Sequence, residues 1–255
     1  MKIVVAYKWA ANPQDASVAP NGAVDWSRAK YAVSEYDPVA IELARQLADA
    51  TGAELIGVSV GEKQVASPMA KKAALSRGLD KLVLVADDAL AGAGPVKFGL
   101  VLAEVIKGIG DVDLVLAGDS SIDVGQQTVP AVIAGALGWP TVSQVTKVSG
   151  TAGDLTVERN FQGGSQVLKA TGPVVLSAAA DAVTPRVPGM KDILAAGKKP
   201  AEEVPYSAPQ LGSAVEVTGQ SKLTLKARKG HLIDAADPAA AATTLVGALK
   251  ATINR

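Results

Sequence analysis

The sequence predicts an α/β fold: a mainly parallel, open sheet flanked by helices and extended at one edge by antiparallel strands. Two observations predict it. Before Pro140, short β-branched runs alternate with longer segments of helical period, which is typical of a parallel sheet covered by helices. After Pro140, alternating residues separated by turn signals predict hairpin strands instead. With 48% hydrophobic residues among 255, the chain has enough apolar material for a sizeable core.

A long excursion separates the first strand from the first helix. "KIVVAY" (Lys2–Tyr7) predicts the strand, and "DPVAIELARQLADATG" predicts the helix, because its apolar residues recur every four positions. Asp37 stands directly before Pro38, so we expect its side chain to cap this helix. Residues 10–36 form the connection between the two elements.

The elements that follow alternate in the same way. Further strands are predicted at Ala53–Gly61, Lys81–Asp87 and Asp113–Gly118, and further helices at Ser67–Leu79, 96–110 and Pro130–Leu137. Ser67 is the expected cap of its helix, because Pro68 then occupies the first helical position.

The last third of the chain divides into a sheet extension and an arm. "TVSQVTKVSG" and "LTVERNF" flank "TAGD" and predict a hairpin, and "QVLKATGPVVLSAAA" adds more extended chain. Beyond Asp181 the composition turns to Pro, Lys and Ala, without a clear core period before a final helix at Asp237–Ile253, capped by Asp237. We therefore expect an α/β domain over residues 1–181 and an arm over residues 182–255.

The chemistry-bearing residues exclude several classes of protein. The chain has no cysteine, one histidine (His231, in the arm), and none of the GxSxG, P-loop or HExxH motifs. We therefore expect no metal site and no enzyme that performs covalent catalysis with its own side chains. Its 25 basic and 25 acidic residues cancel, which gives no reason to expect nucleic acid as a partner. Without a leader or a long apolar run, we expect a cytoplasmic protein with no membrane insertion.

A polar loop follows the strand that ends at Gly118. In an open parallel sheet, ligands lie outside the carboxyl ends of the strands, and "AGDSSIDVGQQTV" begins there. Gly118 and Gly125 let backbone approach a ligand closely, and the free N–H groups of the next helix point at the loop. Gln126, Gln127 and Thr128 add neutral donors. This pattern predicts a Rossmann-like nucleotide site; a polar loop without a ligand is the alternative.

Six stretches, in order along nearly the whole chain, resemble the β subunit of electron transfer flavoprotein (the ETF-β/FixA family). They are "VVAYKW", "SEYDPVAIELA", "VSVG", "GDSSIDVGQQTVPAVIAGALGWP", "VERNFQGGSQVLKATGPVVL" and "TPRVPGMKDILAAGKKPAEEV". The resemblance implies an electron-carrier subunit that is not itself an enzyme. It forms a heterodimer with an α subunit that holds the redox-active FAD, and the arm packs on that partner.

The resemblance also implies a second nucleotide, AMP or a second FAD, bound by this subunit. The positions that match the family's site and its phosphate end are Ala6, Ser34, Asp37, Val60, Asp123, Gln126, Gln127, Thr128 and Val129. Tyr36 matches an aromatic position beside the α-subunit flavin.

A recognition loop is implied around Met190, which stands where the family usually has Leu. By resemblance, this loop docks flavin-dependent dehydrogenases, with Arg186, Lys191 and Ile193 beside the methionine anchor. The implied partners of the protein are such dehydrogenases or a quinone- or ferredoxin-linked acceptor.

Two alternatives to an AMP-binding carrier remain open. One is an electron-bifurcating member of the family, with its own FAD in this subunit. The other is a stand-alone adenine-nucleotide-binding protein of the stress type, which needs no flavoprotein partner.

Overall fold

The computed structural model describes residues 1–209, 224–228 and 230–253. They fall into two compact units. One holds the sheet and most of residues 1–209, and the other includes the C-terminal helix α6 (Pro238–Ile253). Among the helices that these residues form, none has the length and apolar content needed to cross a membrane.

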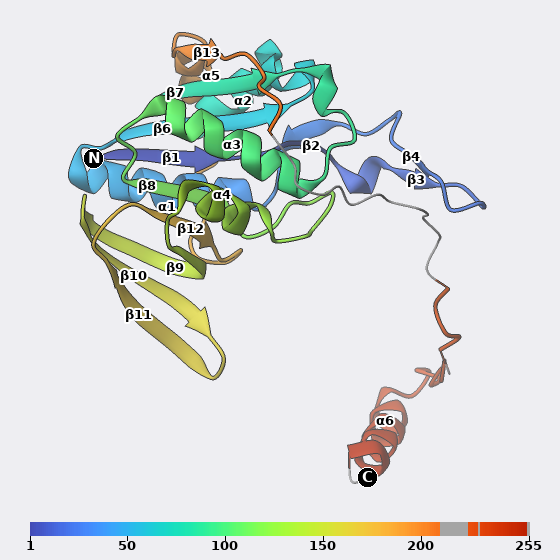
Figure 1. Cartoon of the computed structure of the whole chain (residues 1–255). Coiled ribbons are helices and arrows are strands. Elements are labelled where there is room, and N and C mark those ends of the chain that lie inside the picture. Colours follow the sequence, from blue (N-terminus) through green and yellow to red (C-terminus); the bar gives the residue numbers. More distant parts are fainter. Residues whose placement is uncertain (210–223, 229, 254–255) are drawn as a thin grey trace. The chain divides into compact units, whose positions relative to one another are not determined.

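The described residues form one nine-stranded sheet, which confirms the predicted fold class (Figure 1). In spatial order the strands are β11 (Gly164–Ala170), β10 (Asp154–Phe161), β9 (Thr141–Thr151), β12 (Val174–Ala178), β8 (Leu114–Gly118), β1 (Lys2–Ala6), β6 (Glu54–Gly61), β7 (Lys81–Ala86) and β13 (Ala201–Glu203). Neighbours from β9 to β13 pair in parallel. The β9–β10 and β10–β11 pairs are antiparallel, as the hairpin signal predicts.

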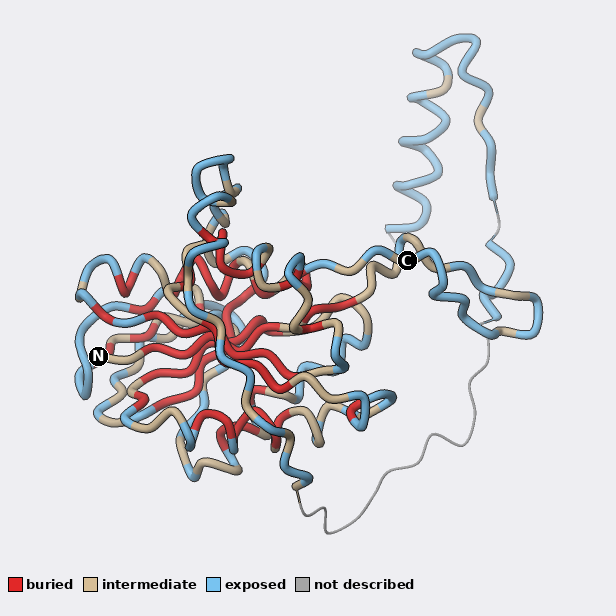
Figure 2. Tube along the Cα trace, turned by 90° about the horizontal axis from the view of Figure 1, so that it is seen from above, coloured by how far each residue is buried: buried red, intermediate tan, exposed pale blue. Residues whose placement is uncertain are grey.

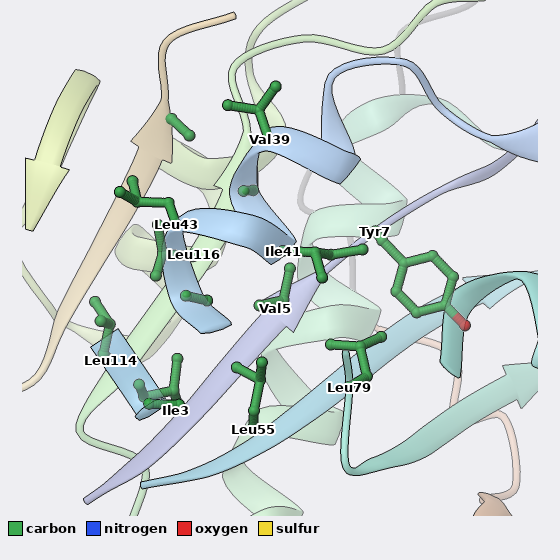
Figure 3. Close-up of a cluster of buried hydrophobic side chains, with 14 of the residues drawn as sticks. Ile3, Val5, Tyr7, Val39, Ile41, Leu43, Leu55, Leu79, Leu114 and Leu116 are labelled. Atoms are coloured by element: carbon green, nitrogen blue, oxygen red, sulfur yellow. The ribbon is translucent and has the colours of Figure 1, made fainter. Parts of the chain in front are cut away.

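Helices cover both faces of the parallel part of the sheet. One face carries α1 (Asp37–Thr51), α2 (Pro68–Leu75) and α5 (Met190–Ala196), and the other carries α3 (Pro95–Ile109) and α4 (Val129–Leu137). Side chains alternate between the faces along each strand. In β1, Ile3 and Val5 pack in the α1 cluster drawn in Figure 3, whereas Val4 and Ala6 pack in the α3 cluster. Figure 2 shows the resulting buried centre.

The excursion after β1 forms small ribbons. Their elements are β2 (Trp9–Ala11), η1 (Pro13–Asp15), β3 (Ser17–Val18), β4 (Val24–Asp25) and β5 (Tyr31–Val33). β2 pairs with β5 and β3 with β4, both antiparallel, so the chain returns to the end of β1 before α1 begins. Two further 3₁₀ turns, η2 (Lys63–Ala66) and η3 (Asp88–Leu90), follow β6 and β7.

Two of the predicted helix caps are confirmed. The Ser67 hydroxyl accepts the Ala70 N–H at 3.2 Å, and the Asp237 carboxylate accepts the Ala239 N–H at 3.0 Å. The predicted helix from Ser67 to Leu79 is shorter than expected and ends at Leu75. It ends early because the chain turns at Gly78, whose φ is +107°, and so returns Leu79 to the core.

Part of the predicted arm packs on the sheet domain. β13 pairs with β7 at the edge of the sheet. The Lys199 ammonium donates to the carbonyl of Leu75, the last residue of α2 (3.3 Å), and to that of Leu79 beyond it (2.5 Å). The Arg186 guanidinium forms a bidentate ion pair with Glu42 of α1, at 2.6 and 3.1 Å. These elements are too short for a periodic signal, which is why the sequence pattern shows no core period there.

Candidate functional site

The candidate site lies where β1, β6 and β8 end, because parallel strands bring their carboxyl ends to one edge. Ala6 and Gly118 are the last residues of β1 and β8, and Val60 is the penultimate residue of β6. Ala6 and Val60 are buried in the α3 cluster, so they form the floor of this edge.

Lys8 joins the end of β1 to the start of α1 through its backbone. Its N–H donates to the Asp37 carboxylate at 2.7 Å, and its carbonyl accepts the Ser34 N–H at 2.9 Å. The prediction that Asp37 caps α1 is therefore wrong. Asp37 is the first residue of α1, Tyr36 is the N-cap, and the carboxylate binds the backbone of a neighbouring element instead.

Burial changes the acidity of Asp37. Its side chain is buried, and desolvation raises the pKa of Asp37 to about 7, while the N–H groups of Lys8 and Gly118 act in the opposite direction. The Lys8 charge also lowers this pKa, and the Asp123 charge raises it. The start of α1 thus holds a carboxyl group that titrates near neutral pH.

Gly118 is needed at the end of β8 because α1 begins against it. A Cβ at Gly118 would lie 2.6 Å from the Asp37 carboxylate oxygen and 2.9 Å from the Tyr36 backbone. The close approach that this glycine allows is therefore that of the Tyr36–Asp37 backbone and carboxylate.

Two contacts hold the first half of the polar loop. The Asp123 carboxylate pairs with the Lys8 ammonium at 2.6 Å, and the Ser34 hydroxyl accepts the Ile122 N–H at 3.2 Å. Gly125 has φ of +65°, a conformation that glycine adopts without strain, so this residue allows the loop to turn here.

The second half of the loop leads into α4. Gln126, Gln127 and Thr128 are exposed, and Val129 begins the helix. Within the described part of the chain, no side-chain hydrogen bond caps this helix at Thr128. Because Pro130 has no N–H, the Val129 and Ala131 N–H groups remain as the donors of its first turn.

A buried carboxylate that the sequence analysis missed lies beside the loop. Asp119 follows β8 directly, is only 9% exposed, and accepts hydrogen bonds from Ser177 of β12, Gln127 of the loop and Gln144 of β9. The available signals were a serine inside the apolar run of β12 and an acid directly after a buried strand.

The four predicted recognition residues have different environments. Met190 and Lys191, at the start of α5, are exposed, the methionine to 73%, whereas Ile193 is half-buried. Arg186, whose side chain is 42% exposed, pairs with Glu42 of α1 and so attaches the segment to that helix. Val187 and Leu194, not singled out from the sequence, are 90% and 64% exposed.

One comparison with known proteins bears on this geometry. Residues 22–209 match the family model described as the electron transfer flavoprotein domain. The match includes α1, the polar loop, the β9–β11 extension and α5.

We expect Gly118→Ala to lower the free energy of unfolding by about 1–3 kcal/mol, because the new Cβ overlaps backbone and carboxylate that cannot rotate away. Urea denaturation measures it. The matched control is Gly108→Ala, at an exposed position of α3 with nothing within 4 Å of its Cβ position. This control should be neutral or stabilising by up to about 1 kcal/mol. Equal effects of the two substitutions would show that the close approach at Gly118 is unimportant.

We expect Asp37 to make stability depend on pH. Because its folded-state pKa lies above the unfolded value, its stabilising contribution is complete below about pH 4 and is lost as the pH rises through about 7. Relative to wild type, Asp37→Asn should therefore gain stability across that window, by up to about 1.4 kcal/mol per pH unit.

Urea denaturation of both proteins between pH 4.5 and 8.5 measures this dependence. Asp88→Asn is the control, since the pKa of that exposed carboxyl lies below its ordinary value and it does not titrate in the window. A constant difference between wild type and Asp37→Asn would contradict the prediction.

Proposed function

The chain belongs to the electron transfer flavoprotein family, and we propose that it is the β subunit of a heterodimeric electron carrier. In this role it binds AMP, or a second FAD, at the carboxyl edge of β1, β6 and β8. It also helps to enclose the FAD of an α subunit, so that electrons pass from dehydrogenases to a downstream acceptor. The observation that carries the nucleotide proposal is the loop from Asp119 to Thr128, which leads into the uncapped first turn of α4.

The residues of this loop fit the phosphate end of a nucleotide. Neutral amides and the N–H groups at the start of α4 are suitable donors for a phosphate that is held permanently. Three acidic side chains lie at this edge: Asp123 pairs with the Lys8 ammonium, Asp37 binds the Lys8 N–H, and Asp119 binds Ser177 and two glutamine amides. A triphosphate would bring further negative charge against these carboxylates, so the composition of the site favours AMP or FAD over ATP.

Redox chemistry in this proposal belongs to the flavin, which accepts and donates the electrons. The residues of this chain bind the nucleotide and help to orient the flavin. In this proposal Tyr36, which is half-buried as the N-cap of α1, is the aromatic residue beside the partner's flavin. In α6, Leu245, Val246, Leu249 and Ile253 are exposed, which supports the proposal that the C-terminal arm packs on the partner subunit.

The test is co-expression with a candidate FAD-binding α subunit, purification through a tag on this chain, and quantitation of the nucleotides released by acid. One FAD and one AMP per heterodimer is the expected result. Two FAD would identify a two-flavin or bifurcating carrier. Recovery of the chain without a partner, holding ATP or nothing, would refute the proposal in favour of a stand-alone protein.

The proposed dehydrogenase-docking element is α5. Its segment exposes Val187, Met190 and Leu194, while Arg186 on one side and Lys199 on the other bind α1 and the end of α2. A short helix that is attached on both sides is already ordered, which lowers the entropy cost of docking.

Met190→Ala should raise the apparent KM of the dehydrogenase for the heterodimer about tenfold and leave kcat unchanged, since an apolar anchor contributes to binding and not to the flavin chemistry. Steady-state reduction of the heterodimer measures it. Met69→Ala, at a 64% exposed position of α2, is the control and should leave KM unchanged. If both substitutions act alike, α5 has no special role in docking.

A further inference from the structure

The Asp119 carboxylate accepts hydrogen bonds from three separate segments of the chain. Its Oδ1 accepts the Ser177 hydroxyl of β12 at 3.0 Å. Its Oδ2 accepts the side-chain amides of Gln127, at 3.1 Å, and Gln144. Among the described residues, no lysine or arginine forms an ion pair with Asp119. The hydrogen-bond partners of this carboxylate are therefore neutral donors from three separate segments of the chain.

Both glutamines have left-handed backbone conformations. Gln127 has φ of +55° and Gln144 has φ of +58°, values that residues with a Cβ rarely adopt. Gln144 lies at a register shift in the pairing of β9 with β12. The amides of both glutamines donate to the same oxygen, Oδ2 of Asp119. Hydrogen bonding to this oxygen therefore explains why both residues adopt an unfavourable backbone conformation.

We infer that Asp119 is a positioning residue that holds the second half of the nucleotide loop in its binding shape. The inference rests on the proposed function, because the loop is the proposed phosphate cradle. Gln127 directly precedes Thr128, the N-cap of α4, so its bond to Asp119 sets how the chain enters the first turn of the helix. Ser177 and Gln144 tie the same carboxylate to the sheet.

If Asp119 positions the loop, its oxygens matter as hydrogen-bond acceptors and its negative charge does not. Asp119→Asn keeps an oxygen for the two glutamine amides, and its new NH₂ group can donate to the Ser177 hydroxyl. Asp119→Ala removes every acceptor. Gln144→Gly removes one donor but keeps a residue that adopts positive φ freely, so the backbone of β9 is not strained by the change.

The first measurement is hydrogen–deuterium exchange of the full-length chain, together with any partner subunit that co-purifies. Asp119→Ala and Gln144→Gly should speed exchange in peptides covering residues 119–129 about tenfold or more, while peptides of β8 and β12 stay as in wild type. Asp119→Asn should lie within about threefold of wild type. Asp111→Gly is the matched control, since Asp111 also has positive φ (51°) and lies outside the network.

The second measurement is AMP titration by calorimetry on the same variants, after any bound nucleotide has been removed from each protein. Asp119→Ala and Gln144→Gly should weaken AMP binding about tenfold, and Asp119→Asn should restore near wild-type affinity. Unchanged loop exchange in both Asp119→Ala and Gln144→Gly, or equal acceleration in β8 and β12, would overturn the inference. If wild type binds no AMP, AMP binding itself is refuted, and the exchange data still decide whether Asp119 positions the loop.

Discussion

The candidate site depends on how closely the start of α1 approaches the ends of β1 and β8. The Asp37 carboxylate binds the Lys8 N–H, and Gly118 leaves room for Asp37 and Tyr36 where any other residue would place a Cβ. This contact brings the excursion of residues 10–36 back to the sheet and puts Ser34 within reach of Ile122 in the polar loop. Residues from three distant parts of the chain therefore meet at one sheet edge.

Two of the interactions that hold the polar loop differ in strength. The Lys8–Asp123 pair has partly exposed side chains, 32% and 19%, so solvent screens it and such a pair contributes about 0–1 kcal/mol. Asp119 is more deeply buried, and hydrogen bonds to a charged acceptor contribute about 1.5–3 kcal/mol each. Of these two, the second therefore contributes more to the order of the loop, which it joins to β9 and β12.

The same contrast between anchored and exposed groups applies to the segment after β12. Arg186 and Lys199 attach it to α1 and to the end of α2, and β13 adds it to the sheet. Between these attachments α5 presents apolar side chains to solvent. Exposed apolar side chains on a segment that is attached on both sides are typical of a surface that binds a partner.

Local interactions were determined by the sequence alone. The strand and helix alternation, the β9–β10 hairpin and the caps at Ser67 and Asp237 involve residues within a few positions of each other, so the pattern of residue types was sufficient. The tertiary structure decided the rest. Asp37 looked like a cap but binds Lys8, 29 residues earlier, and Asp119 receives donors from residues 8, 25 and 58 positions away. Where a side chain has both a local and a distant possible partner, the packing of the sheet and helices decides which hydrogen bond forms. A buried hydrogen bond to the distant partner is the costlier one to lose, because a buried polar group without a partner is destabilising.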